Sequence, residues 1–434
     1  MEIKSENLKK HVVTLCNDYG VRLAGSAAEK NAEIYCAELM KSYGLKSEIE
    51  EFPLMERRVE SEVLEIKING KWVKFPASLF GMAPSTNGKV VEAELVVHDT
   101  MSGYRKKDLS YLTGKAVIHL GCHWEDPENY ERLMKADPAF LLCVDVRYPG
   151  NLPLADGLFP AYVKMYGAKP TMNIAYADAL SWLRNGAEKA RLCVKGGAVP
   201  SISGNVVTTI QGTDPDAGIV YVGGHIDTQA GTVGADDNAI GTAAVLEIAR
   251  ALSKEKHRRT IKLIIFGAEE QLSVGSACYI RKHRKEVEKY GTFMVNYDSF
   301  GAAMGWTNLM CTGAKNTMKN IDQTFQKHDV YAVIDQTYSP YIDNFSFNVC
   351  GVPSVWVYRS NCTAGLFYHH RADNTPDQLC YETSAKHVEA GLELVRYYAD
   401  SPRPADALRK IPAKMKAGID QMWIDVYGGW KPAK

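Results

Sequence analysis

The stretch GGHIDTQAGTVGADDN, residues 223–238, places one histidine and three aspartates among glycines directly after the apolar run GIVYV. Imidazole nitrogens and carboxylate oxygens are the usual protein ligands of divalent metal ions. Residues of the same types follow three further apolar runs, and they are Glu269 with Glu270, Asp298, and His369 with His370. Any one of these positions alone would be explained better by an ordinary role, such as a helix N-cap for Asp237. Their recurrence at successive strand ends indicates a metal site.

Two divalent ions held about 3.5 Å apart need a carboxylate between them, together with one histidine and one carboxylate for each ion. The sequence supplies a bridge, a first pair and a second pair, namely Asp237, His225 with Asp298, and Glu270 with His369. Asp227 follows His225 by two residues and could accept the proton of the other imidazole nitrogen, which would fix the tautomer. Glu269 then remains beside the ions, where a hydrolase needs a general base.

The elements that must position these residues follow from the apolar pattern after residue 204. Four segments predict buried strands, namely GIVYVGG, TIKLIIFG, GTFMVNY and PSVWVYR. Helical segments separate them, such as AAVLEIARAL, in which Val245, Ile248, Ala249 and Leu252 share one face. The predicted fold class is α/β, with a mostly parallel sheet flanked by helices. Functional residues of such sheets collect beyond the carboxyl ends of the strands, where this sequence has its acids and histidines.

The earlier parts of the chain have other patterns. Residues 26–44 predict a helix, because apolar residues recur on one face, Ser26 and Glu29 form a capping-box pair, and Gly44 can end it. KSEIEEF then alternates like a strand. From residue 60, short strand-like segments alternate with turns, and they include GKAVIHLG, AFLLCVDV and ARLCVKG. We therefore expect a catalytic domain of residues 1–59 and 198–434, with an inserted β-rich domain of residues 60–197.

Length and composition restrict the class of protein. A chain of 434 residues is too long for one ordinary core, and 46% hydrophobic with 24% charged residues is typical of a globular protein. Lys plus Arg equals Asp plus Glu at 51 each, so neither nucleic acid nor a membrane surface is an expected partner. The N-terminus lacks the apolar core of a signal peptide, which predicts a cytoplasmic location. Ten scattered cysteines predict buried thiols, not disulfides.

Several segments together resemble the motifs of one enzyme family. GGHIDT, GADDNAIGTAAVLEIA, GAEEQLSVGSACY, NYDSFG and YHHRAD are similar to the successive motifs of the co-catalytic di-zinc aminopeptidases, whose relatives include glutamate carboxypeptidase. The resemblance covers residues 21–52 and 203–380 and implies the zinc exopeptidase fold. The inserted section resembles the protease-associated domain of many members, though less specifically. Two Zn²⁺ per chain are implied, and mixed nitrogen and oxygen ligands would also accept Co²⁺ or Mn²⁺.

The last motif departs from the family pattern. The family usually has a histidine followed four residues later by an aspartate, whereas HHRADN offers two histidines. The spacing to Asp373 favours His369 as the metal ligand, with His370 as the alternative.

A second departure lies in YSPYIDNFSF, where Asp343 keeps its place but its neighbours differ from the serine-aspartate-histidine run of many relatives. Relatives can use a tyrosine hydroxyl near this point to stabilise the oxyanion, and Tyr338 or Tyr341 could take that role. A buried core position is the commoner one for a tyrosine. A related carboxypeptidase clan inserts a dimerisation lid before the last histidine, and the segment from Asp298 to His369 is too short to contain it.

The chemistry implied is metal-assisted hydrolysis of a peptide or amide bond, with Glu269 taking a proton from the attacking water and returning it to the leaving amine. We expect an exopeptidase, and an aminopeptidase first, because no arginine cluster offers a clamp for a terminal carboxylate. The alternatives are a carboxypeptidase-type or small-amide hydrolase on the same site, and a single-zinc acyltransferase similar to glutaminyl cyclases. A binding protein on an inactive peptidase scaffold ranks last, since the ligands and the base are all present.

Two regions carry no assigned role. The inserted domain could cover the active site and limit substrate size, or it could mediate pairing. The aromatic tail after Asp406 is expected to pack on its own domain, with a contact to a second subunit of a homodimer as the alternative.

Overall fold

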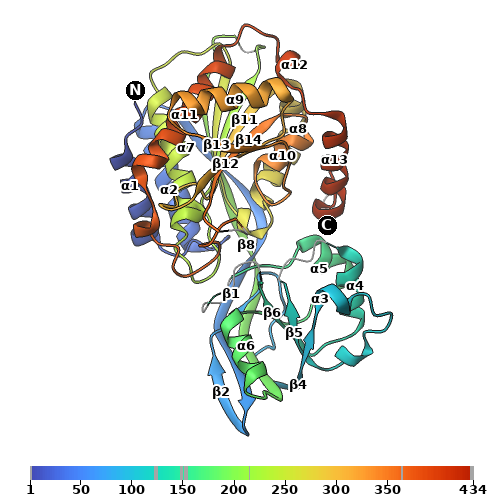
Figure 1. The fold of residues 1–434 in the computed structure, drawn as a ribbon. Coiled ribbons are helices and arrows are strands. Elements are labelled where there is room, and N and C mark those ends of the chain that lie inside the picture. The colour runs from blue at the N-terminus through green and yellow to red at the C-terminus, as the bar shows by residue number, and fades with distance from the viewer. Residues whose placement is uncertain are drawn as a thin grey trace.

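A computed structural model describes residues 2–121, 126–146, 150, 155–214, 216–362 and 365–430. Its centre is a run of parallel strands, each paired with the next (Figure 1). In spatial order they are β10 (Thr260–Phe266), β9 (Ile219–His225), β11 (Gly291–Tyr297) and β14 (Ser354–Ser360). These are the four strands that the sequence predicts, and the α/β fold class is confirmed. Every residue of β9 and β11 is buried, as expected for strands covered on both faces.

Helices cover both faces of this sheet. The larger core lies under α1 (Ser5–Thr14), α2 (Ala27–Ser42), α7 (Ile240–Leu252), α9 (Lys315–Lys327) and α11 (Tyr381–Asp400). The opposite face is covered by α8 (Val274–Tyr290) and α10 (Asn344–Val349). Short helical turns complete the domain: η1 (Leu15–Tyr19), η3 (Ala235–Ala239), η4 (Glu269–Gln271) and η5 (Pro376–Gln378).

Two strands at one edge of the sheet are not predicted by the sequence. They are β12 (Trp306–Cys311), antiparallel to β14, and β13 (Ala332–Asp335), parallel to β12. Thr307 and Asn308 interrupt the apolar pattern of β12. Both are buried and hydrogen-bonded, to His387 and to Ser360 respectively, so tertiary contacts satisfy polar groups that made this segment look like a loop.

The predicted N-terminal helix is α2, and its cap differs from the expectation. Ser26 Oγ accepts a hydrogen bond from Glu29 N, which is half of a capping box. The Glu29 carboxylate does not complete the box, because it accepts instead from the backbone nitrogens of Gly25 and Ala268 and from Ser203 Oγ. Glu29 therefore links this helix to the turn that follows β10.

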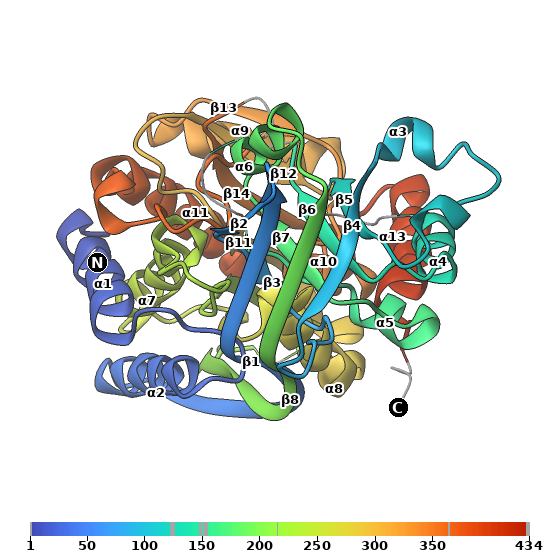
Figure 2. The same cartoon turned by 90° about the horizontal axis from the view of Figure 1, so that it is seen from below.

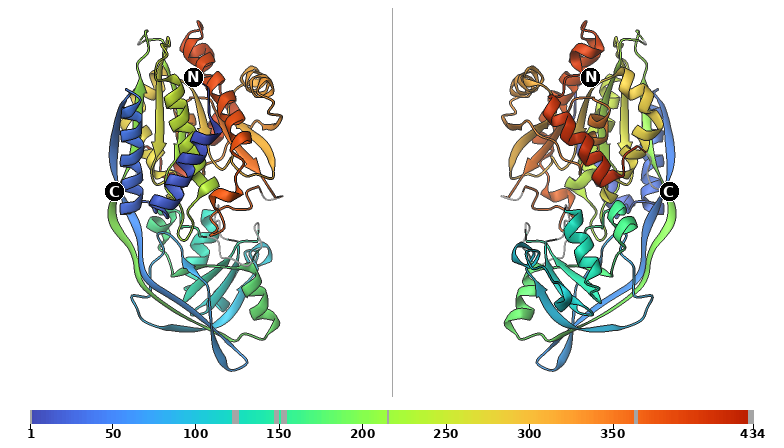
Figure 3. Two further views of the ribbon diagram at one scale, coloured as in Figure 1. Left: turned by 90° about the vertical axis from the view of Figure 1, so that its left-hand side faces the viewer. Right: turned by 90° about the vertical axis from the view of Figure 1, so that its right-hand side faces the viewer.

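A long two-stranded ribbon connects the two halves of the molecule. β1 (Lys46–Ile68) and β8 (Lys189–Ile210) run antiparallel over nearly their whole length and curve along one side of the molecule (Figures 2 and 3). The predicted domain boundaries at residues 59/60 and 197/198 fall inside these strands, where Arg58 pairs with Gly197 and the register shifts between Val59 and Ser61.

The inserted section has its own core of residues between Leu64 and Val194. Its remaining strands are β2 (Lys71–Phe75), β3 (Ser78–Leu79), β4 (Val91–His98), β5 (Ala116–Leu120), β6 (Phe140–Val144) and β7 (Thr171–Ile174). The predicted strands are present, and β4 to β7 pair in parallel. The sequence did not predict the helices between them, which are α3 (Thr100–Gly103), η2 (Ser110–Leu112), α4 (Pro127–Lys135), α5 (Pro160–Tyr166) and α6 (Tyr176–Arg184).

A buried histidine predicts that acid destabilises the insert. His119 hydrogen-bonds Tyr104 and the carbonyl of Gly121, and burial lowers its pKa to about 3. Between pH 6.5 and 3 the unfolded chain therefore binds more protons than the folded one, so the free energy of unfolding falls as pH falls. A His119→Gln variant should lose roughly 2 kcal/mol less than the wild type between pH 7 and pH 5. Urea unfolding at both pH values measures this; equal losses in the two proteins would contradict it.

The C-terminal tail packs on its own chain, as expected. After α12 (Ala405–Leu408), α13 (Ala413–Tyr427) contacts α10 and also reaches α5 of the insert (Figure 1). Trp423 is buried in this contact. All nine cysteines in the described ranges are free thiols. Among the helices that the structure describes, none has the length and apolarity needed to cross a membrane.

Candidate metal centre

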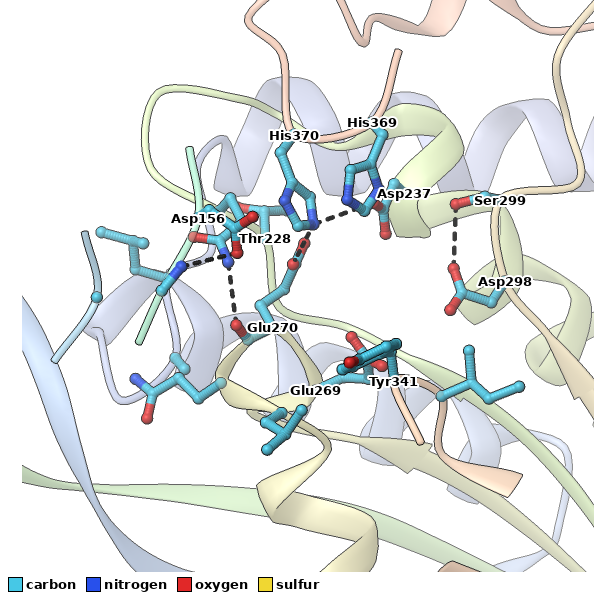
Figure 4. Close-up of a pocket in the computed structure, with 18 of the residues that line it drawn as sticks. Asp156, Thr228, Asp237, Glu269, Glu270, Asp298, Ser299, Tyr341, His369 and His370 are labelled. Carbon is cyan, nitrogen blue, oxygen red and sulfur yellow. Dashed lines mark hydrogen bonds and ion pairs between the residues drawn. The ribbon is translucent and has the colours of Figure 1, made fainter. Parts of the chain in front are cut away.

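The carboxyl ends of the central strands bring the predicted site residues close together around one cavity (Figure 4). Its wall includes Asp237, Glu269, Glu270, Asp298, His369 and His370, whereas His225 and Asp227 are buried and contact this set without lining the cavity. His225 is the last residue of β9, and Asp298 follows β11 directly. Glu269 begins η4 after β10, and Asp237 lies in η3 before α7. The two histidines follow β14 in a loop. The parallel order of these strands is what places residues from four distant segments within contact of one another.

His225 faces three carboxylates. Its Nε2 lies 3.1 Å from Asp237 Oδ1, 3.5 Å from Asp298 Oδ1 and 3.8 Å from Glu269 Oε2. All four side chains are buried. One imidazole cannot compensate the negative charge of three buried carboxylates, whereas a bound divalent cation could.

Asp237 reaches a second group of side chains with its other oxygen. Oδ2 lies 3.4 Å from His369 Nδ1 and 3.6 Å from His370 Nε2. His370 Nε2 also lies 2.8 Å from Glu270 Oε2, and the two imidazole rings stack with centroids 3.5 Å apart. Asp237 therefore stands between two sets of ligand atoms, as a bridging carboxylate must.

Asp227 lies against His225 and also holds the glutamate turn. His225 Nδ1 lies 3.2 Å from the backbone carbonyl oxygen of Asp227 and 3.5 Å from its carboxylate. The carboxylate also accepts the backbone N–H groups of Glu269 and Glu270, at 2.9 and 3.1 Å. Asp227 therefore contacts the nitrogen of His225 that the sequence predicts, and its side chain orients the glutamate turn as well.

The turn that presents the two glutamates is held in an unfavourable backbone conformation. Ala268, Leu272 and Ser273 have φ of +54°, +71° and +48°, a region that non-glycine residues seldom adopt. Glu29 Oε1 accepts from Ala268 N at 3.1 Å, which adds a further hydrogen bond that holds the turn. Strained residues persist where their surroundings determine them from several sides, and such places are often functional.

The electrostatics of the site reflect many acids in a buried space. Burial raises the pKa of Glu269 well above its usual value, and Asp298 adds to the rise. Burial also raises the pKa of Glu270, to about 7. Burial alone would lower the pKa of His225, but Asp298 and Glu269 hold it well above the ordinary value. These opposed shifts reflect several acids and imidazoles packed closely in a buried space, an environment that a bound divalent cation would stabilise.

The residues fit a divalent metal ion. Three overlapping sets have ligand atoms that all lie within 4.8 Å of one another: His225 with Glu269 and Asp298, His225 with Asp237 and Glu270, and Asp237 with His369 and His370. Glu270 Oε1 is buried without a hydrogen-bond partner among the described residues, which leaves a lone pair available for coordination. Mixed imidazole and carboxylate donors suit Zn²⁺.

The cavity over these residues has a volume of about 360 Å³ and takes much of its wall from the insert. Insert residues on it include Met82, Leu158 and Phe159, and apolar residues of the catalytic part include Leu272 and Trp356. Ala155 N donates to His370 O at 3.1 Å, so the insert is attached directly to the histidine loop. The insert therefore covers part of this cavity.

The two candidate tyrosines have different positions. Tyr341 lines the cavity near Glu269 and stacks on Phe159 of the insert (Figure 4). Tyr338 is not part of the cavity wall and packs against α13. Asp343 is buried and absent from the wall as well, and burial raises its pKa to about 8.

The sequence did not predict several other residues that line the cavity beside the candidate ligands. They include Arg57 of β1, Asp156 of the insert, and Ser299 and Trp356 of the catalytic part. Ser299 Oγ donates to Asp298 Oδ1 at 3.1 Å, and Trp356 Nε1 donates to the Asp298 carbonyl at 2.9 Å. Ser299 could have been found, because it follows a predicted ligand. Nothing in the sequence indicates that the loop around Asp156 folds over a strand end more than a hundred residues away.

An open parallel sheet with buried imidazoles and carboxylates converging at its carboxyl edge is the zinc exopeptidase fold. A zinc aminopeptidase from Bacillus subtilis superposes on it with a TM-score of 0.76 at 20% identity, over 95% of this chain and 99% of that one. Residues 205–395 match the family model described as "Peptidase family M28". The match covers the catalytic part of this chain, which is therefore similar to peptidase family M28.

Sequence relatives agree with this assignment. Aminopeptidase YwaD of Bacillus subtilis is 24% identical over 98% of this chain and 91% of its own length. Carboxypeptidase Q of Rattus norvegicus is 29% identical over 48% of this chain and 44% of its own length. The predicted family and fold are confirmed, and so is the predicted class of zinc metallopeptidase.

Proposed function

We propose that this chain is a metal-dependent aminopeptidase that hydrolyses N-terminal residues from peptides. The observation that carries the proposal is one buried cavity in which Glu269 stands beside a complete set of ligand side chains. A binding protein on an inactive scaffold would have no need of that carboxylate. The aminopeptidase relative that aligns over nearly the full chain supports the choice of amino end over carboxyl end.

The proposed metal content is two zinc ions per chain. Asp237 would be shared by the two ions, His225 and Asp298 would hold the first, and Glu270 and His369 would hold the second. The contact between His370 and Glu270 favours His370 as a second candidate for that last position. Bound zinc would supply Lewis acidity, which makes water more acidic and polarises the scissile carbonyl.

The side chains of this protein would do the rest. The Glu269 carboxylate takes the proton of the attacking water and returns it to the leaving amine. Its position is set by Asp227, which holds the Glu269 backbone N–H, and by Ser273 Oγ, which lies 3.2 Å from Oε1. The Tyr341 hydroxyl is the proposed donor to the oxyanion. The insert, proposed as the separate domain of residues 60–197, covers the cavity and excludes bulk water from it.

Mass spectrometry of a defined peptide mixture tests the activity. Zinc-loaded protein is incubated with peptides in free, N-acetylated and C-amidated forms. Stepwise loss of amino-terminal residues that acetylation stops is the expected result, and a chelator should abolish it. Sensitivity to C-amidation alone would show a carboxypeptidase, and survival of every peptide would overturn peptide hydrolysis. A single bound zinc with cyclisation of N-terminal glutamine would show a glutaminyl cyclase-like acyltransferase.

Metal analysis of two neighbouring variants identifies the histidine ligand. His369→Ala is expected to lose about one of two zinc ions, while His370→Ala keeps both, since only the aspartate spacing of His369 matches the family motif. Each variant is a control for the other, because the two rings are stacked on each other and each substitution removes the same side-chain volume. Loss of zinc from His370→Ala alone would assign the ligand to His370.

A further inference from the structure

An apolar surface of the catalytic sheet is exposed to solvent at the edge formed by β12 and β13. Tyr331 is 73% exposed, Val333 51% and Trp306 48%. The alternate residues of these strands point into the core, since Leu309 is buried and Ile334 packs against the same cluster. The exposed side chains therefore share the other face of the sheet.

This surface continues into the cavity. Trp356 on β14 lines the cavity, and its ring stacks on Tyr358 with centroids 3.9 Å apart. Where β12 pairs with β14, Met310 lies opposite Trp356 and Trp306 lies opposite Ser360. Tyr358 lies two residues before Ser360 on β14, so it is on the same outer face, diagonally next to Trp306. In the β13 register Val333 lies beside Asn308, one step further towards the edge. We call the following set the aromatic shelf, which lies around the buried Asn308 and beside the exposed Asp335: Trp306, Met310, Tyr331, Val333, Trp356 and Tyr358.

We propose that the aromatic shelf binds apolar side chains of the peptide substrate that lie beyond the residues held in the cavity. This inference rests on the proposed peptidase function and adds a preference for longer, apolar peptides. The cavity is small, so a longer peptide must leave it, and Trp356 is part of both the cavity wall and the shelf. Stacked aromatic rings on a sheet offer large rigid contact areas, and exposed apolar patches of this kind mark binding surfaces.

Binding on the shelf would act through affinity and not through the chemical step. The shelf residues Trp306 and Tyr331 belong to strands beyond the metal ligands, so their contacts are made before and during hydrolysis alike. Such uniform binding lowers KM and leaves kcat unchanged. A short substrate that ends within the cavity would gain nothing from it.

The test compares peptide lengths in the wild type and in a Trp306→Ala, Tyr331→Ala double variant. Three substrates share the same N-terminal residue: a dipeptide, a decapeptide with leucine and phenylalanine in its distal half, and a decapeptide with serine and glycine there. The wild type should show a KM about tenfold lower for the apolar decapeptide than for the polar one. The double variant should lose that difference and keep wild-type values on the dipeptide. Tyr397→Ala, an exposed tyrosine on α11, is the matched control and should behave as wild type.

Other outcomes overturn the inference. Equal KM values for both decapeptides in the wild type would show that the shelf does not bind the apolar side chains of the substrate. A change in sedimentation coefficient of the double variant without a change in KM would show that the shelf binds a second copy of the chain. Dipeptide hydrolysis by the wild type reports the proposed function separately, so failure of the shelf and failure of the peptidase activity give different results.

Discussion

Glu269→Gln should lower kcat by about 10²–10⁴-fold while zinc binding stays at the wild-type level. The amide keeps the shape of the side chain and can still contact Ser273 Oγ, but it cannot take a proton from water. The backbone N–H of residue 269 would still donate to Asp227, so the turn that carries Glu270 should remain in place. Steady-state kinetics on a peptide substrate, with zinc content by mass spectrometry, measure both quantities.

The control for this variant is Glu48→Gln, which makes the same chemical change at an exposed position of β1. It should have wild-type kinetics. A Glu269→Gln enzyme with full turnover would remove Glu269 from the chemistry. A variant that loses zinc together with turnover would instead make Glu269 a ligand, as its place in one of the three ligand sets allows.

Asp237→Ala is expected to abolish activity by removing zinc from both positions. Its two oxygens contact His225 on one side and both loop histidines on the other. These contacts lower the pKa of Asp237 well below its usual value despite its burial, so Asp237 is held as a carboxylate. Without it the two ligand groups have no shared anion, and two cations so close together would repel each other.

Its neighbour gives a matched comparison. Asp236 is also buried, but its carboxylate accepts the backbone N–H of Gly301 and it is in none of the three ligand sets. Asp236→Asn keeps an acceptor for Gly301 and should retain both zinc ions. Asp237→Asn, which preserves volume, separates loss of charge from loss of fold. Zinc content equal to wild type in Asp237→Asn would contradict the bridging role.

The central strands, and the meeting of the candidate ligands at their carboxyl ends, could be predicted because both depend on local pattern. Runs rich in valine and isoleucine, such as those of β9 and β10, admit few other buried structures of that length. Parallel strands have their carboxyl ends at the same edge of the sheet. The sequence alone therefore predicts that His225 and Asp298 lie close together.

The features that escaped prediction depend on contacts between distant segments. Asn308 in β12 is a polar residue. It can be buried because its side-chain amide donates a hydrogen bond to Ser360 Oγ. The start of α4 does have a sequence signal, because an aspartate followed by a proline, here Asp126 and Pro127, often begins a helix. In the structure the Asp126 side chain accepts a hydrogen bond from Glu128 N. The hydrogen bonds between the Asp227 side chain and the glutamate turn could not be predicted from spacing, because they join two distant segments.

The β1–β8 ribbon has an evolutionary consequence. The insert enters and leaves through two strands that are already hydrogen-bonded to each other, with Arg58 opposite Gly197. A turn of two to five residues between those two positions would close the ribbon as a simple hairpin. The insert could therefore be gained, lost or exchanged as a unit. Such a change would alter which molecules reach the candidate ligands, while the order of the strands that carry those ligands would stay the same.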